Sequence, residues 1–155
     1  MARIPYRDPQ SLSQENRDLL ENIPQLNIFR MIAGSPSLFR PMMELFISYL
    51  AGGLLDPTIR EIVILRVGHQ QKCPYELHQH ERVARTLNMD ETWIAALYPE
   101  SDLNVFPEKE RATISFVDDV VHNIGASDAT FAAMREHYTD AELIELTSII
   151  GIYMM

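Results

Sequence analysis

Two adjacent stretches decide the fold: DPTIREIVILRVGHQQ, residues 56–71, and CPYELHQHERVARTLN, residues 73–88. Each opens with a cap position followed at once by proline (Pro57 and Pro74), which fits a first helical turn because that backbone nitrogen needs no intrahelical acceptor. The first stretch is apolar almost all round, which is typical of a buried helix. Together they predict a helical hairpin joined by a short connection, HQQK, residues 69–72.

The rest of the chain carries helical signals and little of the alternation that strands require. Further helices are expected in NIFRMIAGS, SLFRPMMELFISYLAGG, DETWIAALY, PEKERATISFVDDVVHN, SDATFAAMREHY and TDAELIELTSIIGIYMM. The last segment ends on an apolar run without a stop signal, which indicates packing against a neighbour or a longer natural chain. The sequence predicts an all-α, single-domain helical bundle over residues 25–155, preceded by a polar N-terminal arm over residues 1–24.

The composition excludes several classes of function. The chain has 155 residues, 46% of them hydrophobic, which is enough to bury a core. A formal net charge of -9 would repel a phosphate backbone, so we expect no nucleic-acid partner. We also expect a cytoplasmic protein with no membrane partner, because no window approaches the roughly 18 apolar residues of a spanning helix and no signal peptide is recognisable.

Three polar side chains share one face of the second predicted helix. At about 100° per residue, Cys73, Glu76 and His80 fall within an arc of about 60°, inside the apolar stripe. On the preceding helix, Glu61 shares a face with Gly68, which would allow close approach of another helix, so Glu61 is expected to reach this cluster. Burying such groups costs several kcal/mol unless they are paired, which makes the cluster a candidate site.

The cluster also has a structural interpretation. Glu76 and His80 could form a buried ion pair that fixes helix packing, and Cys73 could be a small apolar residue at a helix end. The chain's one cysteine cannot form an intrachain disulfide. A metal site is not expected, since His78 and His80 lie about 200° apart around the helix and cannot bind one ion.

Arginines on the same two helices are candidates for binding an anionic substrate. Arg60, Arg66 and Arg82 could each bind a carboxylate. We expect the first two at the surface or at an interface, and none of the three is singled out by its spacing.

The segment LDPTIREIVILRV followed by CPYELHQHERVARTLNMDETWIAAL resembles the carboxymuconolactone decarboxylase-like family, which includes the alkyl-hydroperoxidase D-like proteins. NIFRMIAGSPSLFRPMMELFISYL and ERATISFVDDVVHN also fit, so the resemblance covers residues 25–155. The peroxidase branch carries a Glu and, further on, Cys-x-x-Cys with a His four residues after the second Cys. In this sequence Glu61, Cys73 and His80 match the Glu, the first Cys and the His, and Glu76 stands at the second Cys.

The presence of Glu76 at the second Cys position determines which function is expected. In the peroxidase branch, the resemblance implies that the second Cys attacks the peroxide, and a carboxylate cannot form a sulfenic acid. The chain therefore resembles the branch that lacks the Cys pair. The named decarboxylase of the family acts without metal or organic cofactor, so the resemblance implies a small-molecule substrate and no cofactor. It also implies a homo-oligomer, commonly a trimer or a hexamer.

Three functional hypotheses follow. The first is a cofactor-free decarboxylase, lyase or isomerase of a small carboxylated or carbonyl compound, with His80 as proton donor or acceptor, Glu76 sharing the proton and Glu61 tuning the pair. Tyr75 is a candidate substrate-binding residue. The second is a peroxidase or antioxidant that uses Cys73 with an external thiol. The third is a non-catalytic oligomeric binding protein in which the cluster only fixes packing.

Overall fold

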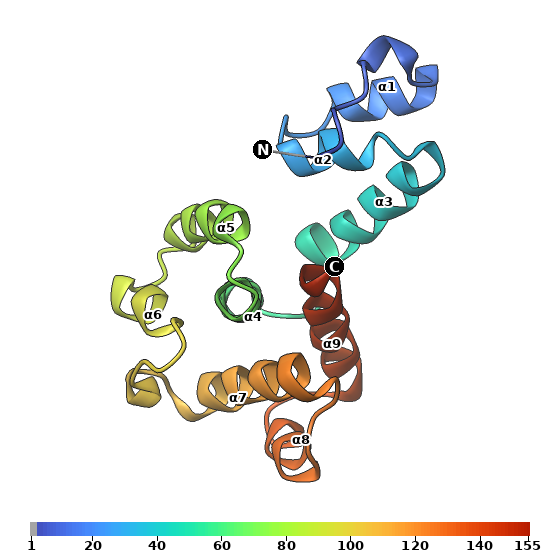
Figure 1. Cartoon of the computed structure of the whole chain (residues 1–155). Helices are drawn as coiled ribbons and strands as arrows, with labels where there is room; N and C mark the ends of the chain where they lie inside the picture. The colour runs from blue at the N-terminus through green and yellow to red at the C-terminus, as the bar shows by residue number, and fades with distance from the viewer. Residues whose placement is uncertain (1–2) are drawn as a thin grey trace. The chain divides into compact units, whose positions relative to one another are not determined.

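A computed structural model describes residues 3–155. These residues form helices and connections without a β-strand, so the all-α prediction is confirmed (Figure 1). The chain divides into two compact units, Met1–Gly53 and Leu54–Met155. The predicted boundary after residue 24 lies inside the first unit, and the assignment of an arm and a domain stays a prediction. Within residues 3–155, no helix is both long and apolar enough to cross a membrane.

The first unit is a small helical cluster around aromatic and aliphatic side chains. Its elements are η1 (Pro9–Ser11), α1 (Gln14–Glu21), α2 (Asn27–Ile32) and α3 (Pro36–Gly52). The core consists of Leu12, Leu20, Ala33, Phe39 and Met43, with further apolar side chains packed against it. The helix expected from SLFRPMMELFISYLAGG is present as α3, and its first residue is Pro36, since proline is favoured at the first position of a helix.

The second unit is built around α4, which Figure 1 shows end-on with α5, α7 and α9 around it. Its elements are α4 (Pro57–Gln70), α5 (Pro74–Thr86), α6 (Glu91–Ala96), η2 (Leu103–Val105), α7 (Glu108–Asn123), α8 (Asp128–Arg135) and α9 (Asp140–Met154). Asp56 caps α4, since its carboxylate accepts from the backbone N–H groups of the first turn. Every residue of α4 from Ile59 to Gly68 is buried, so the prediction of a buried helix is confirmed.

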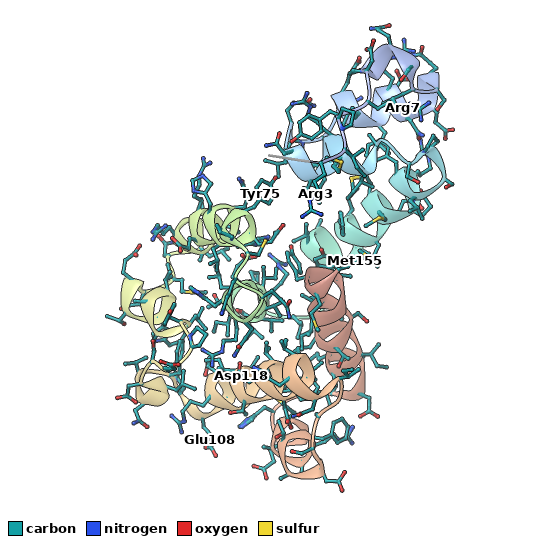
Figure 2. All side chains as sticks on the ribbon, viewed as in Figure 1. Arg3, Arg7, Tyr75, Glu108, Asp118 and Met155 are labelled. Carbon is teal, nitrogen blue, oxygen red and sulfur yellow. The ribbon has the colours of Figure 1, made fainter. Side chains whose placement is uncertain are left out.

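The expectation that Arg60 and Arg66 lie at the surface is wrong. Both are buried, because α5, α7 and α9 pack against α4. Arg66 donates to both carboxylate oxygens of Asp118 on α7, at 2.7 and 2.6 Å, and to the carbonyl oxygen of Leu97 at 2.9 Å. Figure 2 labels Asp118 on α7. This bidentate pair compensates the desolvation of the guanidinium and ties α7 to the central helix.

A tight turn joins α4 to α5. Lys72 adopts a left-handed conformation with φ 52°, and its N–H donates to the carbonyl of His69 at 3.1 Å. The N–H of Cys73 donates to the carbonyl of Gly68 at 2.9 Å, which completes the paired hydrogen bonds of a Schellman motif. A Cβ on Gly68 would lie 3.1 Å from Leu77 Cδ2, so the two helices approach closely there. The predicted hairpin is confirmed.

Candidate acid/base site

The hairpin brings a buried carboxylate against an imidazole. Glu61 is fully buried on α4, and its Oε2 lies 2.7 Å from Nδ1 of His80 on α5. The His80 side chain is 12% exposed. A contact of this length to a fully buried carboxylate fixes the orientation of the ring, because the carboxylate cannot turn to water for another partner. The prediction that Glu61 reaches the cluster is confirmed.

A second carboxylate faces the other nitrogen of the same ring. Glu76, one turn before His80 on α5, has its Oε2 3.7 Å from His80 Nε2, which is longer than a hydrogen bond. Its side chain is 22% exposed, so solvent reaches it more easily than it reaches His80. Burial raises the pKa of the Glu76 carboxyl, and the neighbouring His80 offsets part of that rise. One imidazole is thus flanked by a buried carboxylate at Nδ1 and a partly exposed one at Nε2.

A buried arginine stands on the far side of Glu61. Glu61 Oε1 accepts no hydrogen bond, and Arg60 Nε lies 3.5 Å from it in an ion pair. The Arg60 side chain is only 11% exposed, so this pair is poorly screened by water. Arg60 therefore stabilises the charge of a carboxylate that would otherwise be costly to bury.

The remaining predicted residues lie in the first turn of α5. Cys73 is the N-cap residue, half-buried with a free thiol, and its side chain makes no capping hydrogen bond. Tyr75 is half-buried in the same turn, labelled in Figure 2. Their roles in the site stay predictions. His78 is exposed, and residues 3–155 contain no group of three or more His, Cys, Asp or Glu side chains arranged to hold a metal ion.

Sequence reasoning missed one aromatic neighbour of the imidazole. The ring of Tyr153, near the end of α9, lies with its centroid 5.0 Å from that of His80 and at 84° to it. This edge-to-face geometry is the favoured one for aromatic pairs. The apolar run IIGIYMM indicated only packing, although a tyrosine within it was a signal that one side chain there carries a polar group.

The fold and the Glu61–His80 hairpin define a helical protein of the alkyl-hydroperoxidase D-like class. The chain belongs to the carboxymuconolactone decarboxylase family, whose model matches residues 36–119. That range contains all four predicted catalytic residues, Glu61, Cys73, Glu76 and His80. The resemblance inferred from the sequence is therefore confirmed at the level of the family.

The chain is also similar to solved structures and to a curated relative. A protein of unknown function from Agrobacterium tumefaciens, provisionally assigned to antioxidant defence as AhpD, is 28% identical with a TM-score of 0.70, over 84% of this chain and 88% of that chain. The AhpD core of an uncharacterized peroxidase-related protein from Ralstonia eutropha JMP134 has a TM-score of 0.81 at 21% identity, over 97% of this chain and 84% of that one. Uncharacterized protein YdfG of Bacillus subtilis is 22% identical over 119 residues, 76% of this chain and 80% of its own length.

Proposed function

We propose that this protein is a cofactor-free acid/base enzyme, a decarboxylase, lyase or isomerase of a small carboxylated or carbonyl compound. The observation that carries the proposal is the pairing of His80: Nδ1 lies 2.7 Å from a fully buried carboxylate, and Nε2 has no hydrogen bond to Glu76 at 3.7 Å. A ring held at one nitrogen with the other available is the arrangement that proton transfer requires.

The three side chains have distinct roles in this proposal. When a C–H bond beside a carbonyl breaks, unprotonated His80 Nε2 takes the proton, and the electron pair of that bond moves to the carbonyl oxygen. When CO2 leaves, the electron pair likewise moves to the carbonyl oxygen, and protonated His80 Nε2 then delivers the proton that restores the carbonyl compound. Glu76 shares it, because burial keeps its pKa above the ordinary value and so brings it nearer to that of an imidazole. Glu61 is a positioning residue that holds Nδ1 and stabilises the charged ring.

The test measures, by 1H NMR in D2O, how fast carbon-bound protons beside the carbonyl exchange for deuterium in a panel of small ketones, keto acids and lactones. We expect the parent protein to accelerate exchange or decarboxylation of at least one class, and His80→Ala to lose roughly 10²- to 10⁴-fold of that rate. Glu136→Gln is a matched control, since Glu136 is exposed at the end of α8. No acceleration for any class, or an unchanged rate in folded His80→Ala, contradicts the proposal.

Thiol-dependent peroxide reduction is the second candidate. It is supported by the half-buried free thiol of Cys73 and by the antioxidant assignment of the 28% identical Agrobacterium protein. The thiolate would attack a hydroperoxide, giving a sulfenic acid and an alcohol, and two external thiols would return the cysteine with release of a disulfide and water. The variant Cys73→Ser separates the two candidate functions, when the native turnover of the protein is measured. Loss of most of that turnover with the fold preserved supports peroxide reduction, and an unchanged turnover supports acid/base chemistry.

We also infer a cytoplasmic homo-oligomer, a trimer or a hexamer. The support is the family assignment and a groove of about 660 Å3 between α8 and α9, where Phe131 is 47% and Ile144 is 69% exposed. Exposed apolar residues that line one groove are typical of an interaction surface. Light scattering at micromolar concentration should give three or six times the monomer mass of 17.8 kDa. The monomer mass itself contradicts the inference.

A further inference from the structure

A carboxylate of α9 binds the backbone that leads into α4. Glu145 Oε2 accepts from the N–H of Leu54 at 2.9 Å, and its Oε1 accepts from the N–H of Leu55 at 3.3 Å. Both N–H groups precede Asp56, the N-cap residue of α4. Hydrogen bonds from backbone N–H groups to a carboxylate are directional and stronger than those between neutral groups. Glu145 therefore fixes the position of α9 along its own axis relative to the start of α4.

The inward face of α9 is apolar. Leu146, Ile149 and Ile150 are completely buried, and α9 packs against α4. Figure 1 shows α4 end-on and α9 lengthwise, so the two helices cross and touch only around the crossing point. Burial of apolar surface holds the helices together without a preferred direction. It resists a slide of α9 along its axis less than directional hydrogen bonds do, so we expect the hydrogen bonds of Glu145 to set this position.

The same helix carries the aromatic ring that packs on His80. Tyr153 follows Glu145 by eight residues in α9, about 12 Å along the helix axis. The intervening residues form one hydrogen-bonded helix, so a displacement at Glu145 is carried to Tyr153. The centroids of the Tyr153 and His80 rings are 5.0 Å apart, and the favoured range for aromatic pairs ends at about 7 Å. A slide of about 2 Å is therefore enough to weaken this contact.

We propose that Glu145 is a positioning residue of the acid/base site, which holds the Tyr153 ring against His80 by fixing the position of α9. Glu61 holds Nδ1 of His80, and the Tyr153 ring stands at 84° to the imidazole, so these two side chains together limit how the imidazole can turn. The inference rests on the proposed function and adds to it a residue that acts through Tyr153 and not on the proton itself.

NMR of the His80 ring resonances tests the positioning without a substrate. Tyr153→Ala removes the aromatic ring that shifts these resonances, and Glu145→Ala displaces it, so both variants should move the His80 resonances in the same direction. Glu145→Gln keeps the shape of the side chain and one accepting oxygen, so its shift should be smaller, and it replaces Glu145→Ala if that variant does not fold. Exposed Glu136→Ala is the matched control and should leave the resonances as in the parent.

The rate of proton exchange separates positioning from a merely structural role. Misplacing a catalytic group by about 1 Å costs a large factor in rate, so we expect Glu145→Ala to lose about tenfold. When Glu145→Ala is added to Tyr153→Ala, the rate should fall no further, because the ring through which Glu145 acts is absent. Losses that multiply in the double variant, or His80 resonances that stay unchanged in the folded Glu145 variants, overturn the inference.

Failure of the positioning differs from failure of the proposed function. If the His80 resonances stay unchanged in the folded Glu145 variants while His80→Ala still loses proton-exchange activity, Glu145 does not position the ring and the acid/base function stands. If the resonances move as expected but the parent accelerates exchange for no compound, Glu145 holds the ring contact and the proposed function is wrong.

Discussion

Replacing His80 by leucine tests how far the buried carboxylate depends on the imidazole. Glu61 is fully buried, its Oε1 already accepts no hydrogen bond, and Oε2 lies 2.7 Å from His80 Nδ1. His80→Leu leaves Arg60 Nε, at 3.5 Å, as the charge beside the carboxylate. Removing one partner of a buried ion pair costs about 3–5 kcal/mol, and the solvent contact of His80 is too small to relieve much of it.

The double variant Glu61→Leu with His80→Leu completes the test. Replacing both partners by apolar residues of similar size is often neutral or stabilising, so the double variant should regain most of the lost stability. The assay is equilibrium unfolding in urea on the parent, both single variants and the double variant, with exposed Glu136→Gln as a control expected within about 0.5 kcal/mol of the parent. If His80→Leu lowers the free energy of unfolding by less than about 1 kcal/mol, or if the double variant is as unstable as His80→Leu, the buried Glu61 carboxylate does not depend on the imidazole.

Three further predictions concern the surroundings of the pair. Burial raises the folded-state pKa of the Glu76 carboxyl above its ordinary value of 4.5. The folded protein therefore binds the Glu76 proton more tightly than the unfolded chain does, and the stability that this proton contributes is full below about pH 4.5 and is lost as pH rises through the folded-state pKa. Glu76→Gln should remove this loss of stability with pH, and melting temperatures of Glu76→Gln that keep the parent's pH dependence would contradict the prediction. Tyr153→Phe should keep the ring contact with His80 and most of the proton-exchange rate, whereas Tyr153→Ala should lower that rate and shift the His80 NMR resonances. If both variants lower the rate equally, packing of the Tyr153 ring against His80 is not what supports the rate. Asp118→Ala leaves the Arg66 guanidinium with no carboxylate partner and only the Leu97 carbonyl as an acceptor, and should cost about 3–5 kcal/mol in urea unfolding without changing the pH profile of turnover. A changed pH profile would connect the Arg66–Asp118 pair to the site.

The local pattern of the sequence was sufficient for the helices and their hairpin. The proline signals at Pro57 and Pro74 mark the starts of α4 and α5, because proline is favoured in the first turn of a helix, where its nitrogen needs no hydrogen-bond acceptor. The turn between the helices relies on Lys72 in a left-handed conformation, where glycine is the usual signal, so its geometry could not be read from the sequence. The division after residue 53 follows Gly52 and Gly53, which predicted the end of a helix and not a boundary between compact units.

The candidate site was predictable within α5 and across the hairpin to α4, but not beyond these two helices. Helical periodicity alone brings Glu76 and His80 together, and the apolar surroundings of Glu61 indicate that it faces inward. The burial of Arg66 depends on Asp118, which is 52 positions away, and the ring contact of His80 depends on Tyr153 from the last helix. Contacts between residues so distant in the chain follow from the packing of whole helices, which periodicity does not specify.

The central claim is that His80 transfers a proton with Glu61 holding its other nitrogen. The most direct measurement is the rate of deuterium incorporation beside the carbonyl of a responsive ketone, keto acid or lactone, compared across pH for the parent, His80→Ala and Glu61→Gln. The account predicts a loss of roughly 10²- to 10⁴-fold in His80→Ala and a smaller loss with an altered pH profile in Glu61→Gln. Folded variants that both keep the parent's rate and pH profile would contradict it.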